Sequence, residues 1–394
     1  MICRSTTNDP TVTLPRPQAT GALTVCHVTT VHPALDSRIY LRECVSLAEA
    51  GFAVHLVAPS SMAESTTTAP HPGIQLHSVR RFESRLLRML LGPWQALQIA
   101  RRTGAQLWHL HDPELLPLAA LLPRPPRVRI VYDAHENLPQ DISTKTWIPA
   151  LLRHQVACAA DRIEKFLAGR LDAVVAATET IADRLRAASA MVCVIRNYPR
   201  ACQAEVIPPA ARFAVYAGLL SRRRGLFQMI EACQLEGMPL RLVGHFSDHV
   251  TEAAARSHPG WSNVEYLGRI APDGVRAQLL GASAGLCLLA PDSAHDDALP
   301  TKVFEYMQVG IPVIASRLQR TREVIDRHGC GLCVDYTDME ALRAALARLR
   351  DDAAYRQRLG AAGRDAMLTN YRWEDEARRL CMLYAQLGLT PAKR

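Results

Sequence analysis

From Leu23 onward, short apolar runs rich in β-branched residues alternate with longer amphipathic stretches. Apolar runs of this length between turn residues are typical of buried strands, and the stretches between them have the length of helices. In the first half of the chain we expect strands at residues 23–28, 53–58, 74–78, 107–110, 128–132 and 173–177, and helices at 39–50, 86–102, 115–121 and 151–169. This alternation predicts a parallel sheet covered by helices.

A second series of the same kind follows a linker at residues 197–209, which contains three prolines. Its expected strands are 213–216, 240–243, 264–266, 285–289 and 313–316, with helices at 225–233, 272–280 and from Pro300 or Thr301 to Gly310. We therefore expect an α/β protein with two facing domains, at 23–200 and 201–370, after a disordered tail at 1–22.

Composition narrows the class of protein. The 394 residues are 48% hydrophobic and 21% charged, as in a soluble globular enzyme. No stretch reaches the roughly 20 apolar residues of a membrane-crossing helix, and the N-terminus lacks the apolar core of a signal peptide. The eleven scattered cysteines are typical of reduced thiols, so we expect a cytoplasmic protein. The net charge of +8 suits a diphosphate substrate or an anionic lipid surface, and no nucleic-acid motif accompanies it.

The segment from Leu299 to Ser316 has the features of a helix that receives a phosphate. Pro300 or Thr301 begins the helix and Gly310 ends it. The start of a helix favours an anion, and Lys302 adds a full positive charge there. One turn further, the carboxylate of Glu305 can accept hydrogen bonds from two adjacent hydroxyls, such as those of a ribose. The segment predicts a nucleotide site, with a capped surface helix as the alternative.

Three polar loops follow strands of the first series and are expected at one edge of the sheet, where open α/β sheets bind ligands. They are residues 29–38, 111–114 and 133–137. Asp36 and Asp112 are suited either to ligand binding or to helix capping. The loop containing His135 carries four polar side chains where a cap needs one, so His135 is a candidate functional residue.

Together these pieces resemble the retaining glycosyltransferases of family 4, over about residues 23–387. The stretches that carry the resemblance are 26–39, Leu110-His111-Asp112-Pro113-Glu114, Tyr132-Asp133-Ala134-His135-Glu136, Tyr216-Ala217-Gly218 and the segment 299–316. The resemblance implies the GT-B fold, with two facing Rossmann-like domains and a C-terminal segment, 371–394, whose helix at 373–387 crosses back to the first domain.

The resemblance also implies a donor site. A carboxylate, seven residues and a glutamate mark it in the family, and Asp297 and Glu305 have this spacing. Asp297 would contact the transferred sugar, Glu305 the ribose, and the backbone of Ala298, Leu299, Pro300 and Thr301 the diphosphate. Of the two cations that the family directs at the diphosphate, Arg224 is present, and Leu219 stands at the other position. Arg222, Arg223 and Lys302 could compensate for the missing cation. Gly244 and Arg269 match positions near the base.

The implied reaction transfers a sugar from a nucleotide-diphosphate sugar to a hydroxyl of a saccharide or lipid-linked saccharide, with retained anomeric configuration, in cell-surface polysaccharide synthesis. Arg224 and Lys302 would stabilise the departing diphosphate, and the scheme requires no metal or other cofactor. His135 would line the sugar site, and Asp36, Arg38 and Glu136 would face the acceptor. A sugar-nucleotide epimerase and a catalytically silent scaffold of the same fold are alternatives.

Residues 79–94 mix arginines with Leu, Met and Trp. A helix of this composition can lie on an anionic membrane surface, or it can simply cover the first sheet with its arginines outward. The first alternative predicts peripheral attachment at the inner face of the plasma membrane.

Overall fold

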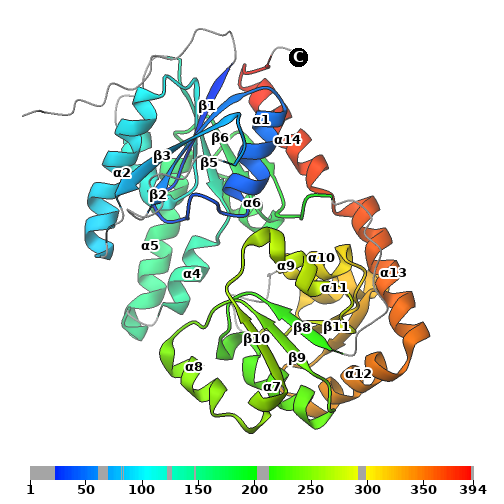
Figure 1. The fold of residues 1–394 in the computed structure, drawn as a ribbon. Coiled ribbons are helices and arrows are strands. Elements are labelled where there is room, and N and C mark those ends of the chain that lie inside the picture. Colours follow the sequence, from blue (N-terminus) through cyan, green and yellow to red (C-terminus); the bar gives the residue numbers. More distant parts are fainter. Residues whose placement is uncertain are drawn as a thin grey trace, which may run out of the picture.

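The computed structural model describes residues 23–60, 70–80, 82, 84–121, 127–145, 148–201, 213–291 and 299–391. The expected tail at 1–22 lies outside these residues, as do Asp297 and Ala298. Two parallel sheets, each covered by helices on both faces, form the two halves of the molecule (Figure 1). This is the expected architecture of two Rossmann-like domains.

The first sheet has seven parallel strands in the order β3-β2-β1-β4-β5-β6-β7. Its strands are β1 (Thr24–Val28), β2 (Ala53–Ser60), β3 (Ile74–Arg80), β4 (Leu107–Leu110), β5 (Arg129–Ala134), β6 (Ala173–Ala176) and β7 (Val192–Val194). From β1 the chain adds β2 and β3 on one side, and it then returns to add β4 on the other side of β1. The strand order therefore reverses between β1 and β4. Ligands bind outside the carboxyl ends of the strands at such a switch point.

Apolar residues alternate between the two faces of this sheet, and each face has its own helices. One face packs against α2 (Arg85–Arg102), α3 (Leu116–Leu121), α5 (Ala150–Ala168) and α6 (Glu179–Arg186). The other packs against the π-helix η1 (Ile39–Cys44), α1 (Val45–Glu49) and α14 (Trp373–Gln386). The single helix expected at 39–50 is thus η1 followed by α1. Short helices η2 (Pro113–Leu115) and α4 (Leu138–Thr144) complete this half.

The second sheet has six parallel strands in the order β10-β9-β8-β11-β12-β13. They are β8 (Ala214–Ala217), β9 (Leu240–Val243), β10 (Val264–Gly268), β11 (Ala284–Cys287), β12 (Val313–Ser316) and β13 (Gly331–Val334). Its helices are η3 (Arg222–Arg224), α7 (Leu226–Leu235), α8 (His249–Arg256), η4 (Pro259–Asn263), α9 (Pro272–Leu279), α10 (Thr301–Gln308), α11 (Gln319–His328), α12 (Met339–Asp351) and α13 (Ala353–Asn370). The helix expected from Pro300 or Thr301 is α10.

The C-terminal helix α14 returns to the first sheet, as Figure 1 shows in red. Its first residue, Trp373, is fully buried and its indole Nε1 donates to Ser46 Oγ at 2.8 Å. Tyr384, at its other end, is also fully buried against the first sheet. The crossover expected at 373–387 is therefore present.

Several details differ from the sequence prediction. The strand expected at 128–132 continues through Asp133 and Ala134, so Asp133 lies in β5 and is fully buried instead of standing in a loop. The strand expected at 285–289 ends at Cys287. Strand β7 was not expected, because three residues are too few for a recognisable pattern. The cysteines in the described part are all free thiols. None of the helices placed there has the length and apolarity to cross a membrane.

The ends of β8 and β9 approach so closely that Gly244 cannot carry a side chain. Its φ is +140°, and a Cβ would overlap the carbonyl oxygen of Gly218. We expect Gly244→Ala to lower the free energy of unfolding by several kcal/mol, because backbone cannot move aside as a flexible side chain can.

Gly237 is the matched control, since its φ is +59° and nothing lies within 4 Å of the place that a Cβ would take. Gly237→Ala should cost only about 1–2 kcal/mol, the strain of the left-handed conformation. Denaturant unfolding measures both variants, and equal losses would contradict this account of the β8–β9 contact.

Candidate active site between the two sheets

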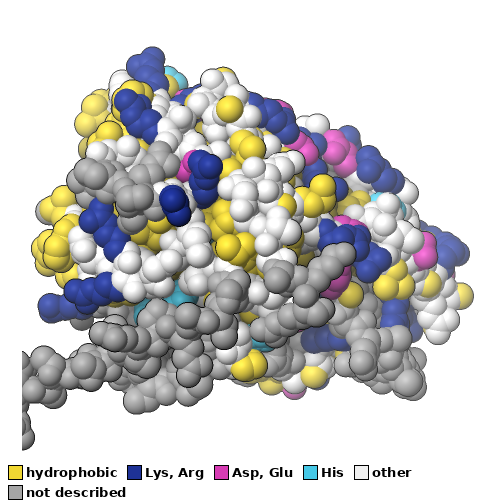
Figure 2. All heavy atoms as spheres, turned by 90° about the horizontal axis from the view of Figure 1, so that it is seen from above, with side chains coloured by type: hydrophobic (Ala, Val, Ile, Leu, Met, Phe, Trp, Pro, Cys, Tyr) yellow, Lys and Arg dark blue, Asp and Glu magenta, His cyan; other side chains and the backbone are white. Residues whose placement is uncertain are grey.

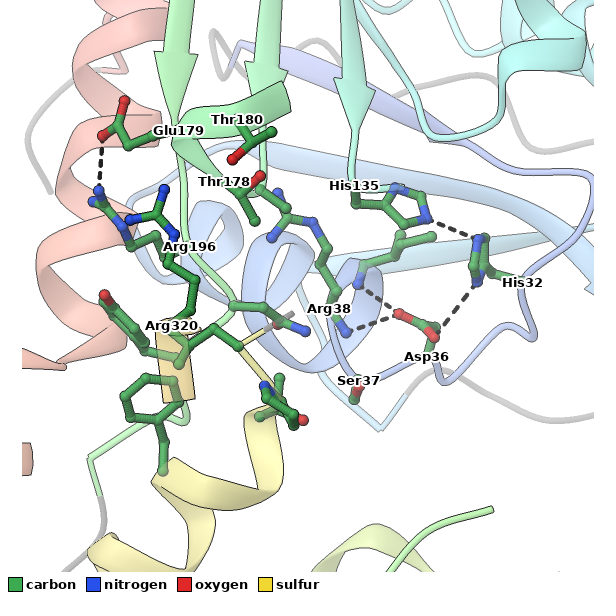
Figure 3. A pocket seen from close by; sticks show the side chains of 18 residues that line it. His32, Asp36, Ser37, Arg38, His135, Thr178, Glu179, Thr180, Arg196 and Arg320 are labelled. Atoms are coloured by element: carbon green, nitrogen blue, oxygen red, sulfur yellow. Dashed lines mark hydrogen bonds and ion pairs between the residues drawn. The ribbon is translucent and has the colours of Figure 1, made fainter. Parts of the chain in front are cut away.

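A cavity of about 480 Å³ lies between the two halves of the molecule, at the carboxyl ends of the first sheet (Figure 3). The first half contributes loops after β1, β5, β6 and β7, and the second contributes the start of α10 and one residue of α11. The lining residues are His32, Asp36, Ser37, Arg38, Ile39, His135, Ala177, Thr178, Glu179, Thr180, Arg196, Asn197, Tyr198, Leu299, Pro300, Thr301, Phe304 and Arg320. A volume of this size accommodates a small organic ligand.

The start of α10 faces this cavity. Leu299, Pro300 and Thr301 line it, and the N-cap residue Pro300 provides no side-chain hydrogen bond to the helix. Backbone N–H groups at the start of an uncapped helix are suited to bind an anion, with the positive end of the helix dipole behind them. The structure thus gives this helix the position that an anion-binding helix needs.

Lys302 lies in the first turn of α10 and is 7% exposed. Its Nζ is 3.7 Å from the centre of the Tyr216 ring, and it has no hydrogen-bond partner among the described residues. A Cβ at Gly218 would lie 3.1 Å from this Nζ, so glycine leaves room beside the ammonium group. A buried cation without a carboxylate partner is costly and is typical of a site that receives an anion.

Arg224 brings a second positive charge to the same region. Burial raises the pKa of the Cys287 thiol at the end of β11, and both Lys302 and Arg224 oppose that rise. The two cations therefore act on the same point at the end of the second sheet. Two positive charges beside an open helix start favour a ligand with more than one negative charge, such as a diphosphate.

Glu305 lies one turn further along α10 and faces a cation from the other half of the molecule. Burial raises the pKa of this carboxyl, while Arg42 and Lys302 lower it. Arg42 comes from η1, is 7% exposed, and donates through Nε to the Tyr198 carbonyl at 2.7 Å. The sequence did not indicate Arg42, because the two residues are far apart along the chain and only the fold brings their charges near each other.

Asp36 and His135 meet through a third side chain, His32. Nε2 of His135 lies 3.0 Å from Nε2 of His32, whose Nδ1 is 3.8 Å from Asp36 (Figure 3). Asp36 also accepts hydrogen bonds from the N–H groups of Arg38 and Ile39, at 2.8 and 3.0 Å, so it caps η1 as the alternative interpretation expected. Burial lowers the pKa of His135 to about 4, and the ring is neutral at neutral pH.

Arg38 lines the cavity, but its guanidinium group is hydrogen-bonded to buried groups of the first domain. Its Nε and one terminal nitrogen donate to both oxygens of Asp133 at 2.8 and 2.9 Å, and the other terminal nitrogen donates to the Ile195 carbonyl. Arg38 and Asp133 are 4% and 0% exposed. The pair fixes the loop after β1 to the end of β5.

The other predicted site residues lie outside the cavity lining. Lys302 and Glu305 belong to α10 itself, and Arg224 lies in η3 near the end of β11. Gly244 packs against Gly218 at the end of β9, and Arg269 is exposed after β10. Glu136 is exposed next to His135. Asp297 and Ala298 lie outside the described residues.

Sequence reasoning missed the cavity residues after β6 and β7. Thr178, Glu179 and Thr180 follow the end of β6, and Arg196 pairs with Glu179 at 2.7 Å (Figure 3). The rule that ligands bind beyond the carboxyl ends of parallel strands could have found the first three, since the strand at 173–177 was expected. Arg320 carries no such signal, because it belongs to a helix of the other half.

Both halves match models of glycosyltransferase domains. Residues 38–198 match the glycosyl transferase 4-like domain, and residues 199–366 match the glycosyl transferases group 1 domain. The chain belongs to the glycosyltransferases of the GT-B type. Within this class, the cavity lies where the two matched domains meet.

A curated relative is also a glycosyltransferase. The chain is 30% identical over 186 residues to the lipopolysaccharide core biosynthesis glycosyltransferase LpsD of Rhizobium meliloti. That match covers 45% of this chain and 52% of LpsD, so it spans about half the length of the curated relative.

Two solved structures share the fold. A sucrose-phosphate synthase from Thermosynechococcus elongatus has a TM-score of 0.74 and 18% identity, covering 93% of this chain and 99% of its own. Anabaena HepE in complex with UDP-glucose has a TM-score of 0.68 and 15% identity, with the same coverage. At such low identity the two structures show the shared fold alone.

Lys302 provides a direct test of the anion site. We expect Lys302→Met to leave the free energy of unfolding unchanged or to raise it by up to about 1 kcal/mol, because an unpaired buried charge is removed. The same change should abolish the rise in melting temperature that a nucleoside diphosphate produces.

Lys165→Met is the matched control, since Lys165 is a partly buried lysine paired with Asp161 on α5 of the first domain. This variant should keep the nucleotide-induced shift. A Lys302→Met protein that still responds fully to nucleoside diphosphates would contradict the assignment.

Proposed function

We propose that this protein transfers a sugar from a nucleotide-diphosphate sugar to a hydroxyl of a saccharide or lipid-linked saccharide, with retained anomeric configuration, in the assembly of a cell-surface polysaccharide. The observation that carries the proposal is the uncapped start of α10 at the interdomain cavity, with Lys302 buried and unpaired among the described residues behind it. The likeness to a lipopolysaccharide core glycosyltransferase supports the type of acceptor.

The donor would lie with its diphosphate on the first amides of α10. A helix start contributes about 0.3–2 kcal/mol to binding an anion, whereas enzymes lower their barriers by about 8 kcal/mol or more. The helix alone is therefore insufficient. Lys302 and Arg224 would stabilise the charge that develops on the leaving diphosphate, in a site from which the two domains exclude water. Lys302 and Arg224 would therefore stabilise the transition state more than the bound donor.

The transferred sugar would occupy the cavity beside His135. Both ring nitrogens of His135 already have partners, the Asp133 carbonyl at 3.3 Å and His32 Nε2 at 3.0 Å, so a sugar hydroxyl would have to replace His32 at Nε2. Because burial lowers its pKa to about 4, the ring is neutral at neutral pH and can donate or accept one hydrogen bond there. Asp297 would contact the sugar from the opposite domain, and Asp36, Arg38 and Glu136 would face the acceptor. Because Arg38 is already bonded to Asp133, we assign it the positioning of the acceptor loop.

Glu305 would bind the ribose of the donor. Two hydrogen bonds to a carboxylate are each worth about 1.5–3 kcal/mol when the carboxylate is charged, and part of this is lost to desolvation. We therefore expect Glu305→Ala to weaken binding of the preferred ribonucleoside diphosphate about 10- to 100-fold. Binding of its 2′,3′-dideoxy analogue should be almost unchanged by the same substitution. Calorimetric titration of both ligands with both proteins measures the difference.

An equal loss for the ribose and dideoxy ligands would contradict the ribose assignment. Product analysis with the wild-type protein, a panel of nucleotide sugars and acceptor saccharides tests the reaction itself. A glycosidic product with the donor's anomeric configuration is the expected result. An epimerised sugar nucleotide without acceptor would favour the epimerase, and the absence of any turnover would favour the silent scaffold.

We further propose that α2 attaches the protein to an anionic membrane surface. The helix packs against β1, β2 and β3 with one side, yet Leu87, Met89, Leu90, Leu91 and Trp94 are each about half exposed or more. Figure 2 shows hydrophobic and basic side chains mixed on the side of the molecule where Figure 1 places α2. Exposed apolar residues beside arginines combine insertion between headgroups with attraction to anionic lipid.

Vesicle flotation tests this attachment. The wild-type protein should float with vesicles of phosphatidylglycerol and phosphatidylcholine but not with phosphatidylcholine alone, because both charge and insertion are needed. Leu90→Ser should reduce flotation severalfold. Leu368→Ser, which changes an equally exposed leucine on α13, should not. Equal flotation with charged and uncharged vesicles would contradict the proposal. An equal loss of flotation in the two variants would also contradict it.

A further inference from the structure

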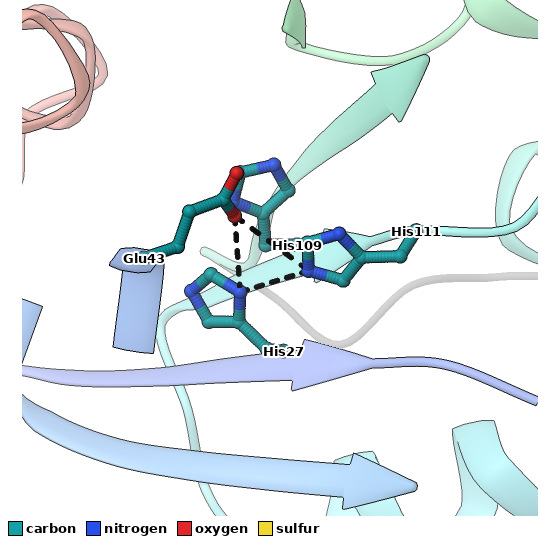
Figure 4. Close-up of side chains that lie close together, drawn as sticks. All are labelled: His27, Glu43, His109 and His111. Atoms are coloured by element: carbon teal, nitrogen blue, oxygen red, sulfur yellow. Dashed lines mark hydrogen bonds and ion pairs between the residues drawn. The ribbon is translucent and has the colours of Figure 1, made fainter. Parts of the chain in front are cut away.

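Three histidines and one glutamate meet inside the first domain, beneath the cavity. His27 lies in β1 and His109 in β4. His111 directly follows β4, and Glu43 comes from η1. All four side chains are 0 or 1% exposed. One ligand atom of each lies within 4.8 Å of those of the others, as the converging side chains of Figure 4 illustrate.

The sheet register accounts for this convergence. His27 is the direct neighbour of His109 across the parallel β1–β4 ladder. His109 and His111 are two residues apart, so their side chains point to the same face of the sheet. That face is covered by η1, which supplies Glu43, and by α14, which supplies Tyr384. Parallel pairing therefore gathers groups from four separate segments of the chain.

Hydrogen bonds alone leave this cluster incomplete. Both carboxylate oxygens of Glu43 and Nε2 of His109 are buried without a hydrogen-bond partner among the described residues. Arg38 Nε lies 3.2 Å from Glu43 Oε1 as an ion pair, but its hydrogen bond goes to Asp133. A buried acceptor without a donor costs about 1–3 kcal/mol, and more when it is charged. Three such atoms in one place are unusual in a folded core.

The outward nitrogens of the histidines are held by a second layer of groups. Nδ1 of His111 lies 3.1 Å from Asp133 Oδ2, and Nδ1 of His109 lies 2.8 Å from the hydroxyl of Tyr384. His27 Nε2 lies 3.4 Å from the same hydroxyl. Each histidine thus uses one ring nitrogen outward and turns the other toward the cluster. Metal-binding histidines are oriented in this way, often by a carboxylate.

The distances inside the cluster suit a small cation. His27 Nδ1 and His111 Nε2 are 2.9 Å apart, and they lie 3.7 and 3.9 Å from Glu43 Oε2. Ligands of a tetrahedral Zn²⁺ with bonds of about 2.0–2.1 Å are separated by about 3.4 Å, and the two distances to Glu43 are near this value. The two ring nitrogens are at hydrogen-bond distance from each other and would move slightly apart around an ion. The nitrogen-rich donor set favours Zn²⁺ or another divalent transition metal over Mg²⁺ or Ca²⁺.

We propose that His27, Glu43, His109 and His111 bind one divalent transition metal ion, foremost Zn²⁺, as a structural centre of the first domain. Four protein ligands without access to solvent are the arrangement of a structural zinc site, which leaves no position for substrate. The ion joins β1, β4 and η1, and through Tyr384 it supports α14. Its presence does not depend on the reaction catalysed, and the scheme of sugar transfer above uses no metal.

Metal analysis of the full-length protein, purified without a histidine tag, is the first test. We expect about one equivalent of a transition metal per chain, because coordination in a preformed buried site is strong. Removal of the ion by a chelator should lower the melting temperature, and Zn²⁺ alone should restore it. The proposal is overturned if protein from metal-supplemented cultures contains no transition metal and its melting temperature ignores Zn²⁺, Mn²⁺, Fe²⁺ and Co²⁺.

Variants locate the ion. Glu43→Gln and His109→Gln should each lose the metal. His55→Gln is the matched control, because His55 and His77 form a similar stacked pair, with 2.8 Å between ring nitrogens, on β2 and β3 of the same sheet. This control should keep a full equivalent. Metal retained in both Glu43→Gln and His109→Gln would assign it to another place and overturn the proposal.

If these variants fail to fold, reconstitution of the wild-type protein with Co²⁺ provides an independent test. Wild-type protein reconstituted with Co²⁺ should show the strong visible absorption of a four-coordinate ion without a thiolate charge-transfer band, since the ligands are nitrogen and oxygen. The weak absorption of a six-coordinate ion, or a thiolate band, would overturn the assignment.

Discussion

The return of α14 to the first sheet is the constraint on which the cavity between the two halves depends. The cavity has walls from both halves of the molecule, so its shape is set by how the two sheets face each other. Trp373 begins α14 fully buried and bonded to Ser46, and Tyr384 anchors the other end of the helix in the same core. The preceding helix, α13, packs in the core of the second domain, so the chain from α13 to α14 ties the two domains together.

Beneath the cavity the first domain contains a polar layer instead of an apolar one. Arg38 and Asp133 form a buried, doubly hydrogen-bonded pair, and the histidine and glutamate cluster lies beside it. Buried charges are tolerated only when their partners are close and well oriented. The layer therefore ties the loop after β1 to β4, β5 and η1, and these are the elements that present Asp36 and His135 to the cavity. A metal ion in the cluster would complete this support.

The second domain, in contrast, contains a buried cation that is not paired with a carboxylate among the described residues. Lys302 is buried against the Tyr216 ring, without a carboxylate bonded to it in the described part of the chain. In the first domain the buried Arg38 is hydrogen-bonded to Asp133, whereas Lys302 Nζ in the second has no hydrogen-bond partner among the described residues. Under the proposed function, the first domain would face the acceptor and the second would supply positive charge for the donor.

The sequence by itself determined the two α/β halves and the helix at Pro300. Strands at 107–110, 240–243 and 313–316 were predicted with the observed bounds, because short, mostly apolar runs between turn residues have few other ways to be buried. Glu305, Lys302 and His135 could be selected because local signals mark them, namely a helix start and a polar loop after a strand. The sequence did not predict strand β7, because it has only three residues. It also did not place Asp133 inside β5, because a charged residue after an apolar run usually marks the end of a strand.

Only the tertiary structure decided which side chains meet. Arg42 faces Glu305 across the two domains, and His27, Glu43 and His109 come together from β1, η1 and β4. No local pattern contains these contacts, because parallel pairing and the crossing of α14 join segments that are far apart along the chain. Periodicity reports which face of an element is buried, but the partner of each buried polar group depends on register and packing, and these exist only in the folded molecule.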